Sequence, residues 1–323
     1  MLEQASRLVS KGLAQVEAQL EQVADQAPPP LTELVRGSLF PPGKRVRPLL
    51  ALLSAKATGK LDDRALRVAA AVELVHTASL IHDDIVDASP LRRGRPTAHK
   101  QHGARVAVLG GDYLIGQALL IAGSLRDLAM IDQVSELMAQ MTEAEVAQFA
   151  DHHQVDVAEQ DYLDVIRGKT AALLSASCAL GALAAEASVE EVNALKAYGY
   201  HLGMAFQITD DTLDFTSNPT RLGKPVGEDI SEGKLTLPVL LALRATSKTR
   251  TKQLKTLLAS QKADTETLER IVALVNELGG AVAARQVAIE HCVRAQEALV
   301  DLVDSKARAA LLDIADWVGQ RDY

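Results

Sequence analysis

Apolar residues recur every three or four positions along almost all of the 323-residue chain. This spacing is that of amphipathic helices, and no segment alternates apolar and polar residues with the period of two that a half-buried strand requires. Leu, Ala and Val supply most of the apolar residues, because aromatic residues make up only 3% of the chain. Ala and Leu favour helices, so the pattern predicts an all-α fold.

The expected helices follow one another with short breaks. An amphipathic N-terminal helix ends near Asp25, before a run of three prolines, and a short helix starts at Leu31. Leu235 begins another apolar helix after a polar segment. Because no linker separates two self-sufficient cores, we expect one multi-helix domain over residues 1–323. The helices between Leu31 and Leu235 are expected at about 46–58, 63–88, 104–124, 129–152, 159–186 and 189–215.

Charge and cysteine content exclude several classes of protein. The net charge of −8 argues against a nucleic-acid partner, which needs an excess of cations on one face. Cys178 and Cys292 lack metal-ligand spacing and fit a reducing compartment, so we expect a cytoplasmic location and no disulfide scaffold. The N-terminal residues lack the pattern of a signal peptide. The apolar stretch 171–185 is shorter than a membrane-spanning helix, so we expect a buried core helix there and no membrane span.

Two acidic clusters have the same internal spacing, and each ends an apolar helical segment. Acids four residues apart share one face of a helix and repel each other, so such a cluster at a buried helix end favours a bound cation. The alternative, a solvated acidic turn, would account for a single cluster of this kind. It accounts less well for two clusters with the same spacing. Their hard oxygen ligands suit Mg²⁺ that bridges a diphosphate, and we expect the two clusters to face one cavity. The first acidic cluster is Asp83, Asp84 and Asp87, and the second acidic cluster is Asp210, Asp211 and Asp214.

Basic side chains near the clusters supply candidate phosphate ligands. Lys44 and Arg47 lie three residues apart at the start of a helix, and Arg92 and Arg93 closely follow the first acidic cluster. Arginine binds phosphate oxygens in a bidentate manner, whereas lysine acts as a point charge. Lys169 lies in an otherwise apolar helix, where a buried cation requires a ligand phosphate or an acidic partner.

The segment 217–234 contains several Pro and Gly residues among charged ones and cannot form a regular helix. Lys224 and Lys234 lie in this segment, and we expect it to close over a diphosphate as a lid. An ordinary exposed loop is the alternative. His76 lies seven residues before the first acidic cluster, on roughly the same helix face, and is a further ligand candidate.

These ordered motifs resemble those of the trans-isoprenyl diphosphate synthase family, also called polyprenyl synthetases. The resemblance covers roughly residues 43–238, about three fifths of the chain. It implies the isoprenoid synthase fold, in which helices surround a central cavity. The matching motifs are Gly43-Lys44-Arg45-x-Arg47-Pro48, Glu73 to Asp84 with Arg92-Arg93-Gly94, Lys169-Thr170, Phe206-Gln207-x-x-Asp210-Asp211-x-x-Asp214, Gly223-Lys224-Pro225 and Gly233-Lys234-x-Thr236-x-Pro238.

The resemblance also implies a role for each matched residue. The Mg²⁺ ligands would be Asp83, Asp87 and Asp210, with Asp84, Asp211 and Asp214 as supporting acids. The allylic diphosphate would be bound by Arg92, Lys169 and Lys224, with Lys234 nearby. The diphosphate of isopentenyl diphosphate would be bound by Lys44, Arg47, His76 and Arg93, while Thr170 and Gln207 would border the reacting atoms. The residues expected to act in catalysis are Asp83, Asp84, Asp87, Lys169 and Asp210.

The implied reaction joins isopentenyl diphosphate to an allylic diphosphate, with Mg²⁺ as cofactor. Product length would depend on the residues before the first acidic cluster, where short-chain members of the family often carry Phe or Tyr. Here the residues five and four positions before Asp83 are Ala78 and Ser79. We therefore expect a long all-trans polyprenyl diphosphate, such as a quinone side-chain precursor. A short product, geranylgeranyl or farnesyl diphosphate, is the alternative.

Other classes of protein share parts of this pattern. Class I terpene cyclases share the first motif but usually replace the second and are richer in aromatic residues. Non-catalytic subunits of heteromeric synthases usually lose the acidic motifs, which are intact here. The resemblance implies a homodimer, and a subunit of a heteromeric synthase is the alternative.

Overall fold

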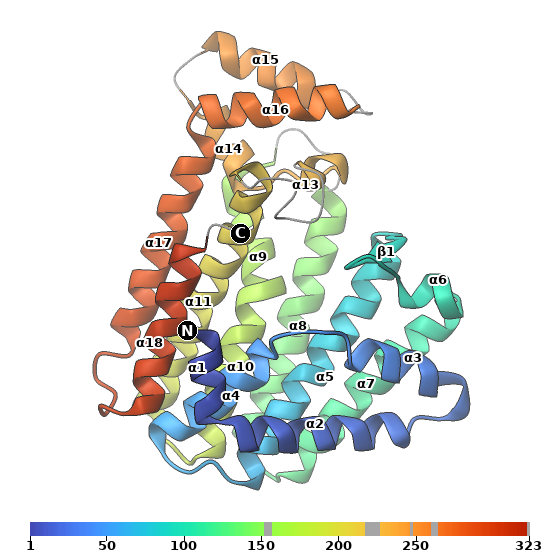
Figure 1. Cartoon of the computed structure of the whole chain (residues 1–323), viewed down its shortest axis with the longest axis vertical. Coiled ribbons are helices and arrows are strands. Elements are labelled where there is room, and N and C mark those ends of the chain that lie inside the picture. The colour runs from blue at the N-terminus through green and yellow to red at the C-terminus, as the bar shows by residue number, and fades with distance from the viewer. Residues whose placement is uncertain (152–156, 217–226, 246–247, 260–263, 322–323) are drawn as a thin grey trace. The chain divides into compact units, whose positions relative to one another are not determined.

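The computed structural model describes residues 1–151, 157–216, 227–245, 248–259 and 264–321 (Figure 1). Nearly all of these residues lie in α-helices or in the turns between them. One small antiparallel sheet joins β1 (Leu91–Arg92) to β2 (Arg95–Pro96). The all-α fold predicted from the apolar spacing is therefore confirmed.

The chain forms two compact units. Unit 1 consists of residues 1–136, 176–196 and 301–311, and unit 2 consists of residues 137–175, 197–300 and 312–323. A single domain over residues 1–323 stays a prediction.

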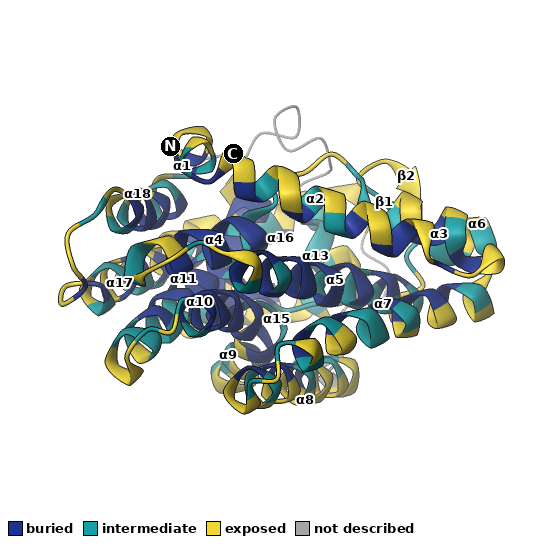
Figure 2. Ribbon diagram, turned by 90° about the horizontal axis from the view of Figure 1, so that it is seen from below, coloured by how far each residue is buried: buried dark blue, intermediate teal, exposed yellow. Residues whose placement is uncertain are grey.

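Unit 1 is organised around α5 (Asp63–Val86), whose side chains are buried on nearly every face (Figure 2). The carboxylate of Asp62 caps the helix by accepting hydrogen bonds from the backbone N–H groups of Arg64 and Ala65. Helix α5 packs against α2, α4 and α7, and it carries the first acidic cluster at its C-terminal end. The other helices of unit 1 are α1 (Leu2–Leu8), α2 (Ser10–Asp25), α3 (Pro29–Leu39), α4 (Val46–Thr58), α6 (Ala98–His102) and α7 (Ala104–Ser124).

Unit 2 holds most of α11 (Val189–Thr216), which carries the second acidic cluster in its last two turns. Its other helices are α9 (Glu159–Ile166), the π-helix η1 (Arg167–Ala171), α13 (Glu228–Ser231), α14 (Leu237–Leu243), α15 (Lys248–Leu258), α16 (Thr265–Glu277) and α17 (Gly280–Ala298). Helices α8 (Leu128–Asp151), α10 (Ala172–Ala184), α11 and α18 (Lys306–Gln320) contribute residues to both units.

The helix boundaries agree with the predicted ranges within two residues, with two exceptions. The N-terminal helix, predicted as one, divides at Val9 into α1 and α2. The range 159–186, predicted as one helix, divides into α9, η1 and α10. A single π-turn inside a helix frequently marks a functional site, and η1 carries Lys169 and Thr170. In the segment predicted to be irregular, residues 217–226 lie outside the described part of the chain, and α13 is a helix of four residues.

Two helices, α5 and α7, are long and apolar enough to cross a membrane by length and composition alone. The apolar stretch of α5 is 72% buried, whereas that of α7 is only 33% buried. Helix α5 is therefore a core helix of unit 1, and α7 presents an unusually apolar exposed face. The absence of a membrane span, expected from the stretch 171–185, stays a prediction.

Candidate active site

The first acidic cluster presents its three carboxylates in different environments. Asp84 is buried, and its carboxylate accepts a hydrogen bond of 2.7 Å from Nε of Arg92. Asp83 is half-buried and Asp87 is exposed. Burial raises the pKa of Asp84, and the positive charge of Arg92 opposes that shift. Asp84 therefore anchors the helix end, while Asp83 and Asp87 are accessible as metal ligands.

The β1–β2 hairpin brings Arg92 back to α5. Its two central residues, Arg93 and Gly94, both have left-handed backbone conformations, with φ of 51° and 74°. Two successive positive φ values are typical of the tightest hairpin turn, whose twist matches that of the strands. The turn also places Arg93, whose Nη1 donates a hydrogen bond of 3.1 Å to the backbone oxygen of Pro42.

Four of the predicted diphosphate ligands gather in unit 1. Burial and the positive charge of Arg47, followed by those of Arg92 and Arg93, lower the pKa of His76 well below its usual value. A neutral histidine among arginines adds a hydrogen-bonding group without adding to the repulsion between cations. Lys44, also predicted as a ligand, is exposed in the turn before α4. The group suits an anion with several oxygens, such as a diphosphate.

Arg45, which lies between the predicted ligands Lys44 and Arg47, has a structural role instead. Its guanidinium contacts Glu17 at 2.6 Å and the buried Glu73 at 2.7 Å. It also donates a hydrogen bond of 2.7 Å to the backbone oxygen of Leu39. Arg45 thereby fixes the start of α4, which positions its two basic neighbours.

The second acidic cluster has the same spacing but different partners. Asp211 is buried, and it accepts hydrogen bonds from the hydroxyl of Tyr162 (2.5 Å) and from Nε2 of Gln207 (2.8 Å). Burial raises the pKa of Asp211 to about 7, although both hydrogen bonds oppose the shift. Asp214 is also buried and faces the backbone N–H groups of residues 228 and 229 at the start of α13. Asp210 is 37% exposed, and its Oδ1 lies 2.7 Å from Nη1 of Arg321.

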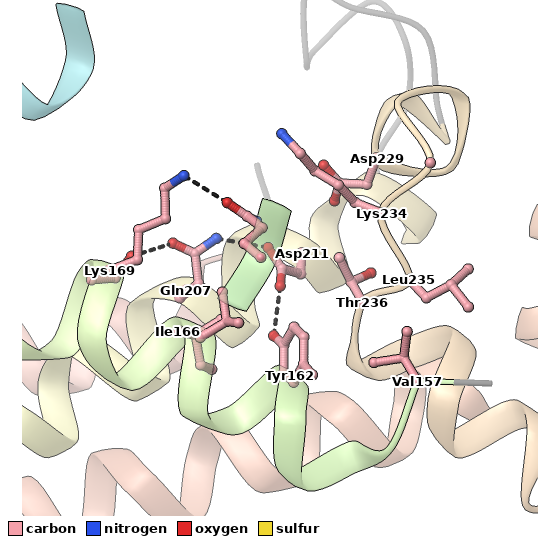
Figure 3. A pocket seen from close by; sticks show the side chains of 14 residues that line it. Val157, Tyr162, Ile166, Lys169, Gln207, Asp211, Asp229, Lys234, Leu235 and Thr236 are labelled. Carbon is pink, nitrogen blue, oxygen red and sulfur yellow. Dashed lines mark hydrogen bonds between the residues drawn. The ribbon is translucent and has the colours of Figure 1, made fainter. Parts of the chain in front are cut away.

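A cavity of about 220 Å³ in unit 2 lies beside the second acidic cluster (Figure 3). Thr170 donates a hydrogen bond of 2.8 Å to Oε1 of Gln207, and Nε2 of Gln207 in turn donates to Asp211. Lys169 is half-buried and contacts Glu145 and Gln148, each at 2.7 Å, so it has the acidic partner that the sequence predicted as one possibility. The polar lining residues are Gln148, Tyr162, Lys169, Thr170, Gln207, Asp211, Asp229, Lys234 and Thr236.

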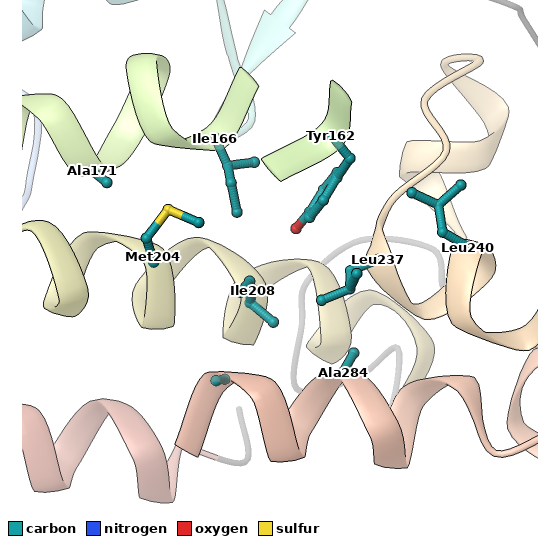
Figure 4. Close-up of a cluster of buried hydrophobic side chains, with 9 residues drawn as sticks. Tyr162, Ile166, Ala171, Met204, Ile208, Leu237, Leu240 and Ala284 are labelled. Atoms are coloured by element: carbon teal, nitrogen blue, oxygen red, sulfur yellow. The ribbon is translucent and has the colours of Figure 1, made fainter. Parts of the chain in front are cut away.

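The apolar part of the cavity wall continues into a hydrophobic cluster of unit 2 (Figure 4). Tyr162 and Ile166 of α9 belong to both, and they pack with Met204 and Ile208 of α11 and with residues of α14 and α17. The aromatic ring of Tyr162 is thus fixed by packing, while its hydroxyl is directed to Asp211. The remaining members of the cluster are Ala171, Leu237, Leu240, Ala284 and Ala288.

The predicted lid contains two lysines, Lys224 and Lys234. Lys234 lines the cavity, and its Nζ lies 3.1 Å from a carboxylate oxygen of Glu232. Lys224 lies outside the described residues. Closure of this segment as a lid stays a prediction.

The acidic residues fit Mg²⁺ by the chemistry of their donor atoms. In the described part of the chain, no three His, Cys, Asp or Glu side chains converge on one point. Mg²⁺ does not require such a cage, because it keeps several waters and binds through one or two carboxylates plus substrate phosphates. The exposed or half-buried acids that suit this mode are Asp83, Asp87 and Asp210.

Several residues of these sites are absent from the predicted set. Tyr162 lies seven residues before Lys169, two helical turns away on the same face. This spacing could have indicated that Tyr162 belongs to the site. Glu145 and Gln148 also precede Lys169 on another helix, and nothing in their spacing links them to it. Arg321 likewise meets the second acidic cluster only through the tertiary fold.

Comparisons with known proteins agree with these motifs. Residues 28–275 match the sequence profile of the family described as polyprenyl synthetase. The chain is 38% identical over 307 residues to a short chain isoprenyl diphosphate synthase of Methanothermobacter thermautotrophicus, with 94% of each chain covered. It is 37% identical over 318 residues to the heptaprenyl diphosphate synthase component 2 of Geobacillus stearothermophilus, with 98% of this chain and 97% of that one covered.

Among solved structures, it resembles a polyprenyl synthase of Caulobacter crescentus complexed with calcium and isoprenyl diphosphate. That likeness has a TM-score of 0.91 and 31% identity, and it covers 100% of this chain and 98% of the other. The chain belongs to the polyprenyl synthetase family, as its motifs predicted.

Proposed function

We propose that the protein is a trans-prenyltransferase that condenses isopentenyl diphosphate with an allylic diphosphate to give a long all-trans polyprenyl diphosphate. The enzyme class predicted from the motifs is confirmed by membership of the family. The observation that carries the proposal is the repeated acidic cluster. In each copy the second aspartate, Asp84 or Asp211, is buried and held by hydrogen bonds, while the first, Asp83 or Asp210, is accessible to a cation.

Mg²⁺ held by Asp83, Asp87 and Asp210 would neutralise the charge that develops on a departing diphosphate. Divalent metal use is supported by the related structure complexed with calcium and isoprenyl diphosphate, and Mg²⁺ as the ion is part of the proposal. The proposal gives both acidic clusters this same task.

The basic residues would bind and orient the substrates. Arg92 and Lys169 would hold the allylic diphosphate, whose C–O bond breaks with the electron pair leaving on oxygen. Arg47 and Arg93, with neutral His76, would hold isopentenyl diphosphate so that its double bond attacks the allylic carbon. A proton then leaves the new chain to the released diphosphate, and water must be kept away from the cation. Lys44, Lys224 and Lys234 are proposed to add positive charge to the same diphosphates.

A long product is supported by α5. Ala78 is fully buried, Ser79 is half-buried, and neither they nor Val75 and Ala71 below them carry an aromatic ring. The related heptaprenyl synthase component is consistent with a long chain, whereas the related short chain synthase represents the alternative. Incubating the purified chain alone with labelled isopentenyl diphosphate and farnesyl diphosphate tests both activity and length. Products no longer than geranylgeranyl diphosphate would refute the long-chain proposal.

We further propose that the protein is a homodimer, in the cytoplasm, with no nucleic-acid partner. The exposed face of α7 supports a second copy as partner, because contiguous apolar surface rimmed by polar residues is typical of interfaces. Changing Leu109 and Leu120 together to Glu should convert a dimer to a monomer in light scattering. The matched control is Val303→Glu. Val303 lies elsewhere in unit 1 and is 72% exposed, so its change to Glu should leave the mass measured by light scattering unchanged. The exposed apolar residues of this face are Val108, Leu109, Leu119 and Leu120.

A subunit of a heteromeric synthase remains the alternative, and one relative is named as a component. Activity of the purified chain alone would exclude a strict need for a second subunit. Inactivity that a partner subunit restores would favour the alternative.

A further inference from the structure

Arg321 directly follows α18 and contacts the second acidic cluster in unit 2. Its Nη1 lies 2.7 Å from Oδ1 of Asp210, and its side chain is 17% exposed, compared with 37% for the acid. This is more burial than an ordinary surface ion pair has. Such a pair, partly removed from water, is screened less by salt and holds its geometry better than an exposed one.

Two aromatic rings hold the guanidinium in place. Its central carbon lies 4.9 Å from the ring centroid of Phe206 and 5.1 Å from that of Trp317. Phe206 precedes Asp210 by one turn of α11, and Trp317 precedes Arg321 by four residues on α18. Both rings therefore contact the guanidinium, one from the segment of each member of the ion pair, and the faces of these rings attract the cation. The chain contains only four Phe and one Trp, so two of its scarce rings lie at this ion pair.

The reaction as proposed gives Arg321 no task, yet it contacts a predicted metal ligand. An oxygen that faces a guanidinium at hydrogen-bonding distance cannot also face Mg²⁺ without cost, because the two cations repel each other at such separations. We propose that Arg321 is a positioning residue that holds Asp210 in the metal-free protein and competes with the divalent ion for it. The inference rests on the proposed function, because it takes Asp210 to be a metal ligand.

The competition has a consequence for the order of events. By reciprocity, whatever weakens the Arg321–Asp210 pair strengthens metal binding, and metal binding weakens the pair. A substrate diphosphate that brings Mg²⁺ would supply the additional charge needed to displace the guanidinium. The substrate-free protein would then bind the ion weakly at the second acidic cluster.

The test measures metal binding without turnover. Mn²⁺ is titrated into substrate-free protein and the free ion is measured by electron paramagnetic resonance. All variants carry Asp83→Asn, which removes a predicted ligand of the first acidic cluster. Arg321→Gln should lower the dissociation constant by roughly three- to tenfold, because a competing charge is lost. Arg321→Lys retains that charge and should stay close to the parent.

The matched control is Arg308→Gln on α18. Arg308 is 18% exposed and pairs at 2.9 Å with Asp304, which is not a predicted ligand, so its loss should leave Mn²⁺ binding unchanged. Trp317, the only tryptophan, gives a second signal. Saturation with Mg²⁺ should change its fluorescence in the parent as the guanidinium moves, and should change it less in Arg321→Gln.

The outcomes separate this inference from the proposed function. Suppose that Asp210→Asn abolishes Mn²⁺ binding, whereas Arg321→Gln leaves binding unchanged, weakens it or removes it. Competition between Arg321 and the metal ion is then refuted, and the proposed reaction stands. If Asp210→Asn alters neither Mn²⁺ binding in the Asp83→Asn background nor turnover in the otherwise unchanged protein, the ligand assignment fails and the inference fails with it. Thermal unfolding of each variant establishes that it is folded.

Discussion

The two acidic clusters share one spacing, but the buried second aspartate of each has different hydrogen-bond partners. In both, the second aspartate is turned inward, and Asp84 and Asp211 are 5% and 6% exposed. Asp84 is held by a charged partner, Arg92, which a two-residue hairpin returns to the helix end. Asp211 is held by neutral donors, Tyr162 and Gln207. In both clusters the helix thus turns the second aspartate inward, whereas the tertiary fold decides what meets it.

This difference bears on the charge of each cluster. Burial raises the pKa of both Asp84 and Asp211. The positive charge of Arg92 opposes the shift at Asp84 more directly than the Tyr162 hydroxyl and the Gln207 amide oppose it at Asp211. The pKa of Asp211 reaches about 7, so this acid titrates near neutral pH in the metal-free protein. Asp84 in the first acidic cluster relies on an ion pair, whereas Asp211 in the second relies on a hydrogen-bonded network.

The largest expected effect is on turnover, and it should be common to both clusters. Asp83→Asn and Asp210→Asn should each lower kcat by on the order of 10³-fold, because a carboxylate that holds the ion is lost. Steady-state condensation of labelled isopentenyl diphosphate measures this, and Asp304→Asn, at a 95% exposed acid, is the control. If only one of the two variants loses activity, the clusters do not share one task.

The next effect is on stability and concerns the second cluster. Tyr162→Phe removes a donor to buried Asp211 and should lower the free energy of unfolding by about 1–3 kcal/mol. The pKa of Asp211 is higher in the folded protein than in the unfolded chain. The stabilisation that Asp211 contributes to the fold is therefore fully present below about pH 4 and is lost as the pH rises through about 7. Because the lost hydrogen bond had lowered that pKa, the variant should be more destabilised at pH 8 than at pH 5.

Urea unfolding of metal-free protein at the two pH values measures the difference. Tyr113→Phe is the control, because its hydroxyl donates to the backbone oxygen of Val23 and not to an acid. Its effect should not depend on pH between 5 and 8. An equal loss of stability for Tyr162→Phe at both pH values would show that Asp211 does not titrate as described.

The smallest effect concerns the first cluster. Arg92→Gln also removes a partner of a buried acid, but Arg92 is 39% exposed and water can replace part of the interaction. Its loss should cost at most about 1 kcal/mol, again more at neutral than at acidic pH because Arg92 lowers the pKa of Asp84. Arg95→Gln, an exposed arginine of the same hairpin, is the control. A larger loss for Arg92→Gln than for Tyr162→Phe would reverse the comparison.

Much of the fold could be predicted because helices depend on local spacing. The ranges around α4, α5, α7 and α11 follow the apolar period, and the acidic motifs end α5 and α11 as their spacing indicated. The π-turn at Lys169 could not be predicted, because the apolar period continues through it and only packing selects the wider turn. Gly168 lies so close to α8 that a side chain there would clash with Ala144, which shows how tight that packing is.

The candidate site was predictable in its acids and bases but not in their partners. Charged residues in an apolar helix are conspicuous in a sequence, which is why Asp210 and Lys169 could be named. Their partners Arg321 and Glu145 come from other helices and carry no local signal. Asp214 illustrates the limit of spacing alone, since it faces the backbone of α13 although its motif position matches that of Asp87.

Divalent ions at the acidic clusters are proposed to drive release of the diphosphate. The most direct measurement is the initial rate of diphosphate release by the purified chain with both substrates, first in chelator and then with Mg²⁺ restored. We predict no release in chelator and full recovery with Mg²⁺. Release at an undiminished rate in chelator would contradict the account.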